Sequence, residues 1–299
     1  MNRLVLITIV SNFIFLMACS GPKIVSQSNM VYEESIKAWQ VERIDALTSP
    51  TGWLSLIGLF WLKEGTTSFG SALTNKIKFP SSTPANIGSF TLENGEVIMQ
   101  INPKVLVKIG DQTPKKITLK ADIVDSTTYA SLGTVNWHLI QRANRFGIRV
   151  RDSHNDAIQS FKGIPNFPIQ EKWNIPATLR PSDTQKEVTL RNVVDMDVQM
   201  KLEGYLVFEI AGQKYELEAM DGGETSYFVI FSDATTGEST YGAGRYLYVP
   251  RVDKSGKTMI DFNKAHNPPC AFTDFATCPL PSAKNQLAIA IPVGEKDYH

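Results

Sequence analysis

MDVQMKLEGYLVFEIAGQKYELEAM, Met196 to Met220, is a long run in which apolar and polar residues alternate on both sides of a short turn. Side chains of a β-strand point in turn to the two faces of its sheet, so this alternation predicts two strands that each bury one face. Ala211, Gly212 and Gln213 interrupt the pattern at its centre, and a glycine between two such runs indicates a hairpin. The stretch therefore predicts an antiparallel hairpin within a β-rich fold.

The same signals recur along most of the chain. SFTLENGEVIMQI, at 89–101, holds Asn94-Gly95 between two alternating runs, and this dipeptide accepts the positive φ angles of a type I′ turn. Before these strands, the apolar residues of 30–48 recur at helical spacing. The predicted fold is mainly β, with two β-sandwich-like or barrel-like halves preceded by one N-terminal helix.

The order of these signals divides the chain into five segments. Residues 152–186 are rich in proline and poor in periodic apolar residues, which predicts a long connection between two halves. The expected segments are a lipoprotein signal peptide at 1–18, a tether at 19–28, the helix with a sandwich-like half at 29–151, the connection at 152–186, and a C-terminal β half with the candidate site at 187–299.

The first residues are typical of an export signal. Arg3 precedes an apolar run that ends in Leu16-Met17-Ala18-Cys19, and such a run is too short to be a spanning helix. A cysteine after Leu-x-Ala resembles a bacterial lipobox, in which Cys19 is acylated and becomes the new N-terminus; an ordinary cleaved signal peptide is the alternative. Several acyl chains on one cysteine hold a protein firmly on a membrane. Ser20 in place of Asp favours the outer membrane, on its periplasmic or surface face.

Charge argues against one class of partner. The sequence has 30 basic and 30 acidic residues, and removal of the leader takes away one basic residue. Nucleic-acid binding needs a concentrated basic face, so this balance argues against a nucleic-acid partner. No dinucleotide, P-loop or zinc-protease motif occurs, and no cofactor is expected.

Two cysteines remain after the leader, Cys270 and Cys278. In an exported protein such a pair is read first as a disulfide, and two buried free thiols are an alternative. A zinc site with His266 and Asp274 is a weaker alternative, since the spacing is not that of a zinc motif. A cysteine nucleophile with His266 as base is weaker still.

Polar residues are dense in the C-terminal third. Asp261 and Asn263 alternate along a strand-like run, and Arg245 follows the small residues Gly242-Ala243-Gly244. Arginine grips carboxylate or phosphate through two parallel hydrogen bonds, so the set would suit an anionic or sugar-like ligand. A buried structural ion pair is the competing interpretation. The candidate binding residues are Arg149, Arg245, Asp261, Asn263, Asn267 and Asn285, and the candidate acids or bases are Asp233, Asp261 and Glu295.

Several longer motifs resemble those of a known family. They are GWLSLIGLFWLKEG at 52–65, RVRD at 149–152, FKGIPNFPI at 161–169, FSDATTGESTYGAGRYL at 231–247, DFNKAHNPPCAF at 261–272, CPLPSAKNQL at 278–287 and VGEK at 293–296. Together they resemble the bacterial family catalogued as domain of unknown function 1684, from about 40 to 296. The resemblance implies one shared fold but no reaction. The family pattern has an aromatic residue where this chain has His266, which argues against a catalytic His266. Members that look cytoplasmic share the cysteines, which argues against a purely disulfide role.

These observations lead to one expected function and two alternatives. The expected function is that of a lipid-anchored cell-envelope protein that binds a small polar or anionic ligand. The first alternative is a hydrolase-type enzyme that uses an Arg/Asp/Asn pocket. The second is a structural envelope protein without a small-molecule site.

Overall fold

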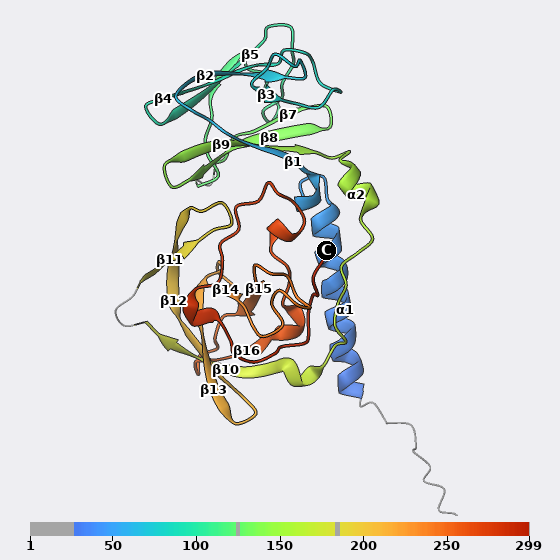
Figure 1. Cartoon of the computed structure of the whole chain (residues 1–299), viewed down its shortest axis with the longest axis vertical. Helices are drawn as coiled ribbons and strands as arrows, with labels where there is room; N and C mark the ends of the chain where they lie inside the picture. Colours follow the sequence, from blue (N-terminus) through green and yellow to red (C-terminus); the bar gives the residue numbers. More distant parts are fainter. Residues whose placement is uncertain (1–26, 124–125, 183–185, 299) are drawn as a thin grey trace, which may run out of the picture.

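The computed structural model describes residues 27–123, 126–182 and 186–298. Cys19 and most of the expected tether lie outside these ranges. The fold is mainly β and is preceded by one long helix, α1 (Gln27–Thr48), as the sequence predicts. Among the described residues, no helix is both long and apolar enough to cross a membrane. Figure 1 shows a smaller β half at the top, a larger one below it, and α1 running along the larger half.

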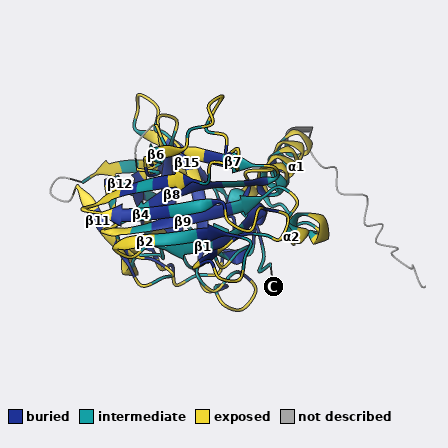
Figure 2. Cartoon of the chain, turned by 90° about the horizontal axis from the view of Figure 1, so that it is seen from above, coloured by how far each residue is buried: buried dark blue, intermediate teal, exposed yellow. Residues whose placement is uncertain are grey.

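The N-terminal half consists of two sheets that share one core. The strand orders are β1-β9-β8-β7 and β3-β2-β4-β5-β6. The strands are β1 Leu56–Trp61, β2 Gly65–Gly70, β3 Ile77–Lys78, β4 Gly88–Glu93, β5 Glu96–Ile101, β6 Lys116–Thr118, β7 Tyr129–Leu132, β8 Val135–Arg142 and β9 Arg145–Asp152. Phe69, Phe90 and Trp137 bring residues of both sheets into this core. Buried strand positions appear dark blue in Figure 2, and the turns are mostly exposed.

The β4–β5 hairpin has the turn that its sequence predicts. Glu93 pairs with Glu96, so Asn94 and Gly95 alone form the turn. Their φ angles are 51° and 80°, and both central residues of a type I′ turn need positive φ. Asparagine and glycine adopt this region more readily than other residues, which is why the chain reverses here.

The C-terminal half is built around a nearly closed, barrel-like sheet. Its strand order is β15-β14-β13-β12-β10-β16, and β11 pairs with an extension of β12. The strands are β10 Asn174–Pro181, β11 Glu187–Arg191, β12 Asp197–Ile210, β13 Gln213–Asp221, β14 Ser226–Phe231, β15 Arg245–Pro250 and β16 Lys257–Asp261. The predicted hairpin at 196–220 forms β12 and β13, and Ala211 and Gly212 at its turn have φ angles of 52° and 82°.

The stretch 152–186, expected as a connection, contains a strand and two short helical turns. They are α2 (Asp156–Ser160), η2 (Glu171–Trp173) and β10. Strand β10 lies between β12 and β16 in the barrel sheet. Pro176 pairs only with β16 and Pro181 only with β12, so each proline lies where the strand has one neighbour rather than two. A proline lacks the N–H for a second ladder, and the staggered pairing accommodates both.

Strands β8 and β9 separate the sandwich core from the C-terminal half. Trp137 and Val150 point into the sandwich core. Arg142 and Arg149 lie on the opposite face and contact Thr277 of the C-terminal half. The alternation of side chains along a strand therefore places two arginines at the junction of the halves.

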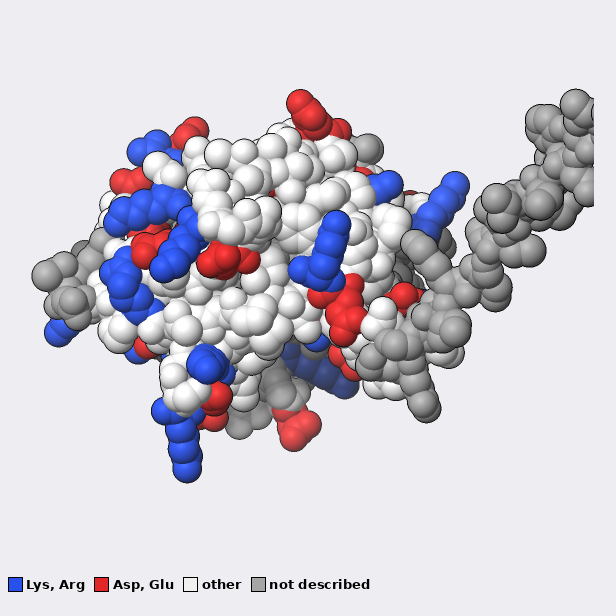
Figure 3. All heavy atoms as spheres, turned by 90° about the horizontal axis from the view of Figure 1, so that it is seen from below, with Lys and Arg blue, Asp and Glu red and all other residues white. Residues whose placement is uncertain are grey.

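Helix α1 ties the N-terminus to the larger half. The Tyr32 hydroxyl donates to Asp261 Oδ1 at 2.7 Å, and Arg43 Nε donates to Glu295 Oε1 at 3.0 Å. At the far end of the barrel, basic and acidic side chains are interspersed on the surface (Figure 3). That face therefore has no large patch of a single sign.

Candidate functional site

Arg245, the centre of the predicted cluster, is fully buried in an ion pair. One of its terminal nitrogens lies 2.6 Å from Asp233 Oδ2, and the guanidinium also donates to the carbonyls of Ile291 and Val293. Burial lowers the pKa of Arg245, and Asp233 opposes this effect. The structure thus differs from the expectation of an open site, because Arg245 and Asp233 neutralise each other inside the fold.

Asp261 and Asn263 hold segments of the chain together. Asp261 Oδ1 accepts from the Tyr32 hydroxyl and from the Asn263 backbone N–H, which caps the turn η3 (Phe262–Lys264). The Asn263 side chain accepts from the Gln170 N–H at 2.9 Å and donates to its carbonyl at 3.0 Å. Burial and the Asp261 carboxylate raise the pKa of Tyr32. These bonds fix α1 and the stretch before β10, so both side chains have a structural explanation.

Glu295 and Asn285 are also buried and bonded within the fold. Glu295 Oε1 accepts from Arg43, and Oε2 accepts from the Asn267 backbone N–H at 2.7 Å. Burial raises the pKa of Glu295 against the opposing effect of Arg43. Asn285 Oδ1 accepts from the Glu218 N–H at 2.7 Å. Neither side chain lines the junction pocket described next.

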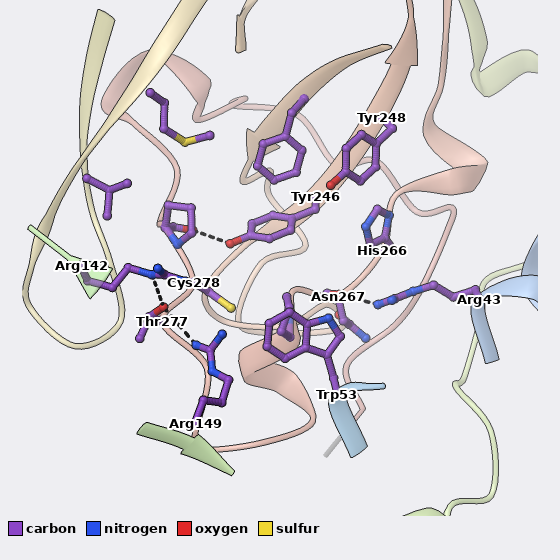
Figure 4. A pocket seen from close by; sticks show the side chains of 15 residues that line it. Arg43, Trp53, Arg142, Arg149, Tyr246, Tyr248, His266, Asn267, Thr277 and Cys278 are labelled. Atoms are coloured by element: carbon purple, nitrogen blue, oxygen red, sulfur yellow. Dashed lines mark hydrogen bonds between the residues drawn. The ribbon is translucent and has the colours of Figure 1, made fainter. Parts of the chain in front are cut away.

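A pocket of about 440 Å³ lies at the junction of the two halves. It falls within the range of ordinary small-molecule sites. Figure 4 shows side chains from α1, from the sandwich and from the C-terminal half converging on it. Of the six predicted binding residues, Arg149 and Asn267 line it. The lining residues are Arg43, Trp53, Arg142, Arg149, Val198, Met200, Phe228, Tyr246, Tyr248, His266, Asn267, Pro269, Thr277, Cys278 and Pro279.

Arg149 is buried in this pocket without an ion pair of its own. It is 3% exposed, and among the described residues it makes no ion pair. It donates weakly to Thr277 Oγ1 at 3.5 Å and lies 5.5 Å from the centroid of the Trp53 ring, while its Nε has no partner. Burial first, and then Arg142 and Arg151, lower the pKa of Arg149 to about 10, and the Asp122 carboxylate, which is paired with Arg142, opposes this effect only in part. Buried charges are normally paired, so this cation lacks an anion.

The other two arginines of the pocket are neutralised. Arg142 binds both oxygens of Asp122 at 2.8 Å and donates to Thr277 Oγ1 at 3.2 Å. Arg43 pairs with Glu295 and donates to the Asn267 carbonyl at 2.7 Å. Figure 4 shows the ends of Arg142 and Arg149 meeting at the Thr277 hydroxyl. The pocket therefore has a net excess of one positive charge, located at Arg149.

His266 is a neutral member of the wall. Its ring lies nearly parallel to Tyr248, 6.0 Å between centroids, and its Nδ1 lies 3.1 Å from the Lys264 carbonyl. Burial, followed by the charge of Arg43, lowers the pKa of His266 to about 3. At neutral pH it therefore adds no charge to the pocket.

The cysteines differ from the predicted disulfide, because Cys270 and Cys278 are free thiols in the structure. The Cys278 Sγ, which lines the pocket, accepts a hydrogen bond from the Cys270 backbone N–H at 3.1 Å. Hydrogen bonding to the Cys270 thiol, and then burial, raise the pKa of Cys278, which disfavours the thiolate needed for nucleophilic attack. No three His, Cys, Asp or Glu side chains in the described ranges come together as a metal site.

Sequence reasoning missed most of the pocket wall. Trp53, Arg142 and Thr277 are not among the candidate residues that the sequence indicates. The available signal was a charged residue on a buried strand, in FGIRVRD at 146–152, where Arg149 and Arg151 share one face. That signal marks one wall, but the opposing wall comes from segments more than a hundred residues away.

The fold and the pocket define a mainly β protein with two halves that enclose a small cationic cavity between them. Residues 159–296 match the model of the family described as "protein of unknown function (DUF1684)", and the chain belongs to this family. The matched segment contains Tyr246, His266 and Thr277, while Trp53 and Arg149 lie before it.

The chain is also similar to solved structures. An uncharacterised protein of Haloarcula marismortui, solved by NMR in solution, is 30% identical; the alignment covers 46% of this chain and 78% of that chain, with a TM-score of 0.39. No curated protein matches the sequence.

Proposed function

We propose that the protein binds a small anionic ligand in the junction pocket and that it does so at the cell envelope, held by lipid on Cys19. The observation that carries the proposed binding role is Arg149, a buried guanidinium that forms no ion pair with any described carboxylate. Arginine presents a planar fork of donors that suits carboxylate and phosphate groups. The proposed envelope location rests on the lipobox-like sequence that ends at Cys19.

Binding is favoured over hydrolysis by the positions of the acidic residues. Asp233, Asp261 and Glu295, the candidate acids or bases, each make hydrogen bonds within the fold and do not line the pocket. The thiol that lines the pocket, Cys278, has a raised pKa. A general base must reach the proton that it abstracts, and none of the described residues that line the pocket is a carboxylate.

The proposal is tested by thermal unfolding of the purified protein with a panel of small organic and inorganic anions. A ligand at 100 times its dissociation constant stabilises the folded state by about 2.7 kcal/mol. We expect at least one anion to raise the melting temperature of the native protein and not that of Arg149→Met. Arg180→Met is the matched control, because Arg180 is an exposed surface residue paired with Glu216. Equal shifts in all three proteins would contradict binding at the pocket.

A further inference from the structure

The charges of the pocket limit the charge of its ligand. Arg43 and Arg142 are already paired with Glu295 and Asp122, and His266 is neutral. Only Arg149 offers an uncompensated charge among the described lining residues. A dianion such as a phosphate monoester would bring a second negative charge into a site with one positive charge to meet it. Burial of that extra charge is unfavourable, so the pocket favours a monoanion.

The geometry around Arg149 favours a carboxylate. The Thr277 hydroxyl accepts from Arg142 at 3.2 Å and from Arg149 at 3.5 Å, so its own proton is free to point toward a ligand. The Arg149 Nε has no partner, and its contact with Thr277 is long. A carboxylate beside Thr277 can therefore accept two parallel bonds from the Arg149 fork and one from the hydroxyl.

The rest of the wall indicates an apolar body. Trp53, Met200, Phe228 and Tyr246 line the same pocket as Arg149, and the Trp53 ring lies against the Arg149 guanidinium. The Tyr246 hydroxyl already donates to the Pro279 carbonyl at 2.9 Å, so this ring presents its carbon face (Figure 4). A sugar would lose its hydration against these surfaces without gaining enough hydrogen bonds. Flat apolar groups pack well against aromatic rings.

From this arrangement we infer that the ligand is a small monocarboxylate with an apolar, preferably aromatic, body. The inference rests on the proposed binding function and names the ligand class for the same pocket. The carboxylate lies between Arg149 and Thr277, and the body lies against Trp53 and the aromatic wall. The cavity of about 440 Å³ limits the body to one or two rings or a short branched chain.

The experiment compares four probes that differ in one property each. Phenylacetate has the inferred charge and body, phenylacetamide lacks the charge, phenyl phosphate carries a second charge, and glucuronate replaces the apolar body by a polar one. Binding to the purified protein is measured by calorimetry and by quenching of tryptophan fluorescence. We expect phenylacetate to bind at least tenfold more tightly than each of the others. Loss of the charge should weaken binding about 10- to 100-fold, as expected for a charged hydrogen-bonded pair.

Three variants separate the parts of the inference. Arg149→Met should bind phenylacetate and phenylacetamide with equal, weak affinity, because the apolar wall remains. Trp53→Ala should weaken both probes by a similar factor and keep the preference for the carboxylate. Circular dichroism and the melting temperature establish that each variant is folded, and Arg149→Lys, which keeps the charge but lacks the fork, should bind phenylacetate with intermediate affinity.

The possible results test the inferred ligand class separately from the proposed anion-binding function. If phenyl phosphate or glucuronate binds most tightly and depends on Arg149, the proposed anion-binding function stands and the inferred ligand class is overturned. If phenylacetamide equals phenylacetate in the native protein, the carboxylate is not recognised and the inference also fails. If no probe binds, the inferred ligand class is overturned, and the panel of anions decides the proposed function. If a probe binds and Arg149→Met does not change its affinity, both the inference and the proposed function are overturned.

Discussion

Replacing Arg149 by methionine should make the protein more stable while it abolishes anion binding. Arg149 is held in the folded state with its pKa lowered to about 10, and the first cause is burial. The pKa of an ordinary arginine lies above 12, and one pKa unit corresponds to 1.36 kcal/mol. The charged form of Arg149 therefore destabilises the folded state by about 3 kcal/mol. This destabilisation is present at every pH below the lowered pKa, which includes neutral pH.

The expected net gain is smaller than this figure. Methionine has similar length and fills irregular apolar space, but it loses the interaction of the buried cation with Trp53, worth about 1–2 kcal/mol. The hydrogen bond to Thr277 is long and contributes little. The free energy of unfolding should therefore rise by about 1–2 kcal/mol, and the melting temperature by about 2–8 °C.

Arg142→Met provides the matched comparison. Arg142 lies in the same pocket, but its two bonds to Asp122 keep the pKa of that carboxyl below its usual range despite burial. Its loss leaves a largely buried carboxylate without its partner and should lower the free energy of unfolding by about 1–3 kcal/mol. Urea denaturation of both variants measures the difference. If Arg149→Met lowers stability as much as Arg142→Met, Arg149 is a structural residue and the reasoning is refuted.

Four further predictions address the remaining features. Cys19→Ala should move the protein from the membrane fraction to the soluble fraction, and unchanged fractionation would contradict lipidation. Arg245→Met should lower the free energy of unfolding by about 3–5 kcal/mol, because it leaves a buried carboxylate unpaired; a loss below 1 kcal/mol in urea denaturation would argue against this. The native protein should lose stability as pH falls from about 6.5 toward 3, because His266 takes up a proton on unfolding, and His266→Phe should lower that slope by up to about 1.4 kcal/mol per pH unit; equal slopes would show that His266 is not held neutral. Cys270 and Cys278 should both react with a thiol reagent after unfolding without prior reduction. Cysteines that react only after reduction would indicate a disulfide.

Local patterns made the strands predictable. The alternation of 196–220 and the Asn94-Gly95 turn depend on neighbouring residues, and both hairpins form where the sequence places them. Strand β10 was missed because Pro176 and Pro181 indicate a connection when only one strand is considered. The place of β10 in the sheet depends on how its two partner strands, β12 and β16, are staggered along it. The sequence of β10 alone does not indicate this stagger.

The site was harder to predict for a related reason. Polar residues dense in a turn-rich segment were interpreted as a binding cluster around Arg245 and Asp261. Irregular segments of the chain lie at the end of the barrel, and their backbone groups need hydrogen-bond partners. The side chains of Asp261, Asn263 and Asn285 accept such hydrogen bonds from backbone N–H groups. The pocket instead combines residues far apart in sequence, such as Arg149 with Thr277, and only the packing of one half on the other brings them together.

Two arginines among the described residues are almost fully buried, and they differ in how their charge is met. Asp233 and two carbonyls contact the terminal nitrogens of Arg245, so the fold itself neutralises this charge, although the Arg245 Nε, like that of Arg149, has no partner. Arg149 has one long hydrogen bond, an unbonded Nε and two other cations nearby. The contacts of this cation with Trp53 and Thr277 do not offset its loss of hydration, and methionine would fill the same space without that loss. The proposed anion, bound between Arg149 and Thr277, would supply the negative charge that no described carboxylate provides as an ion-pair partner.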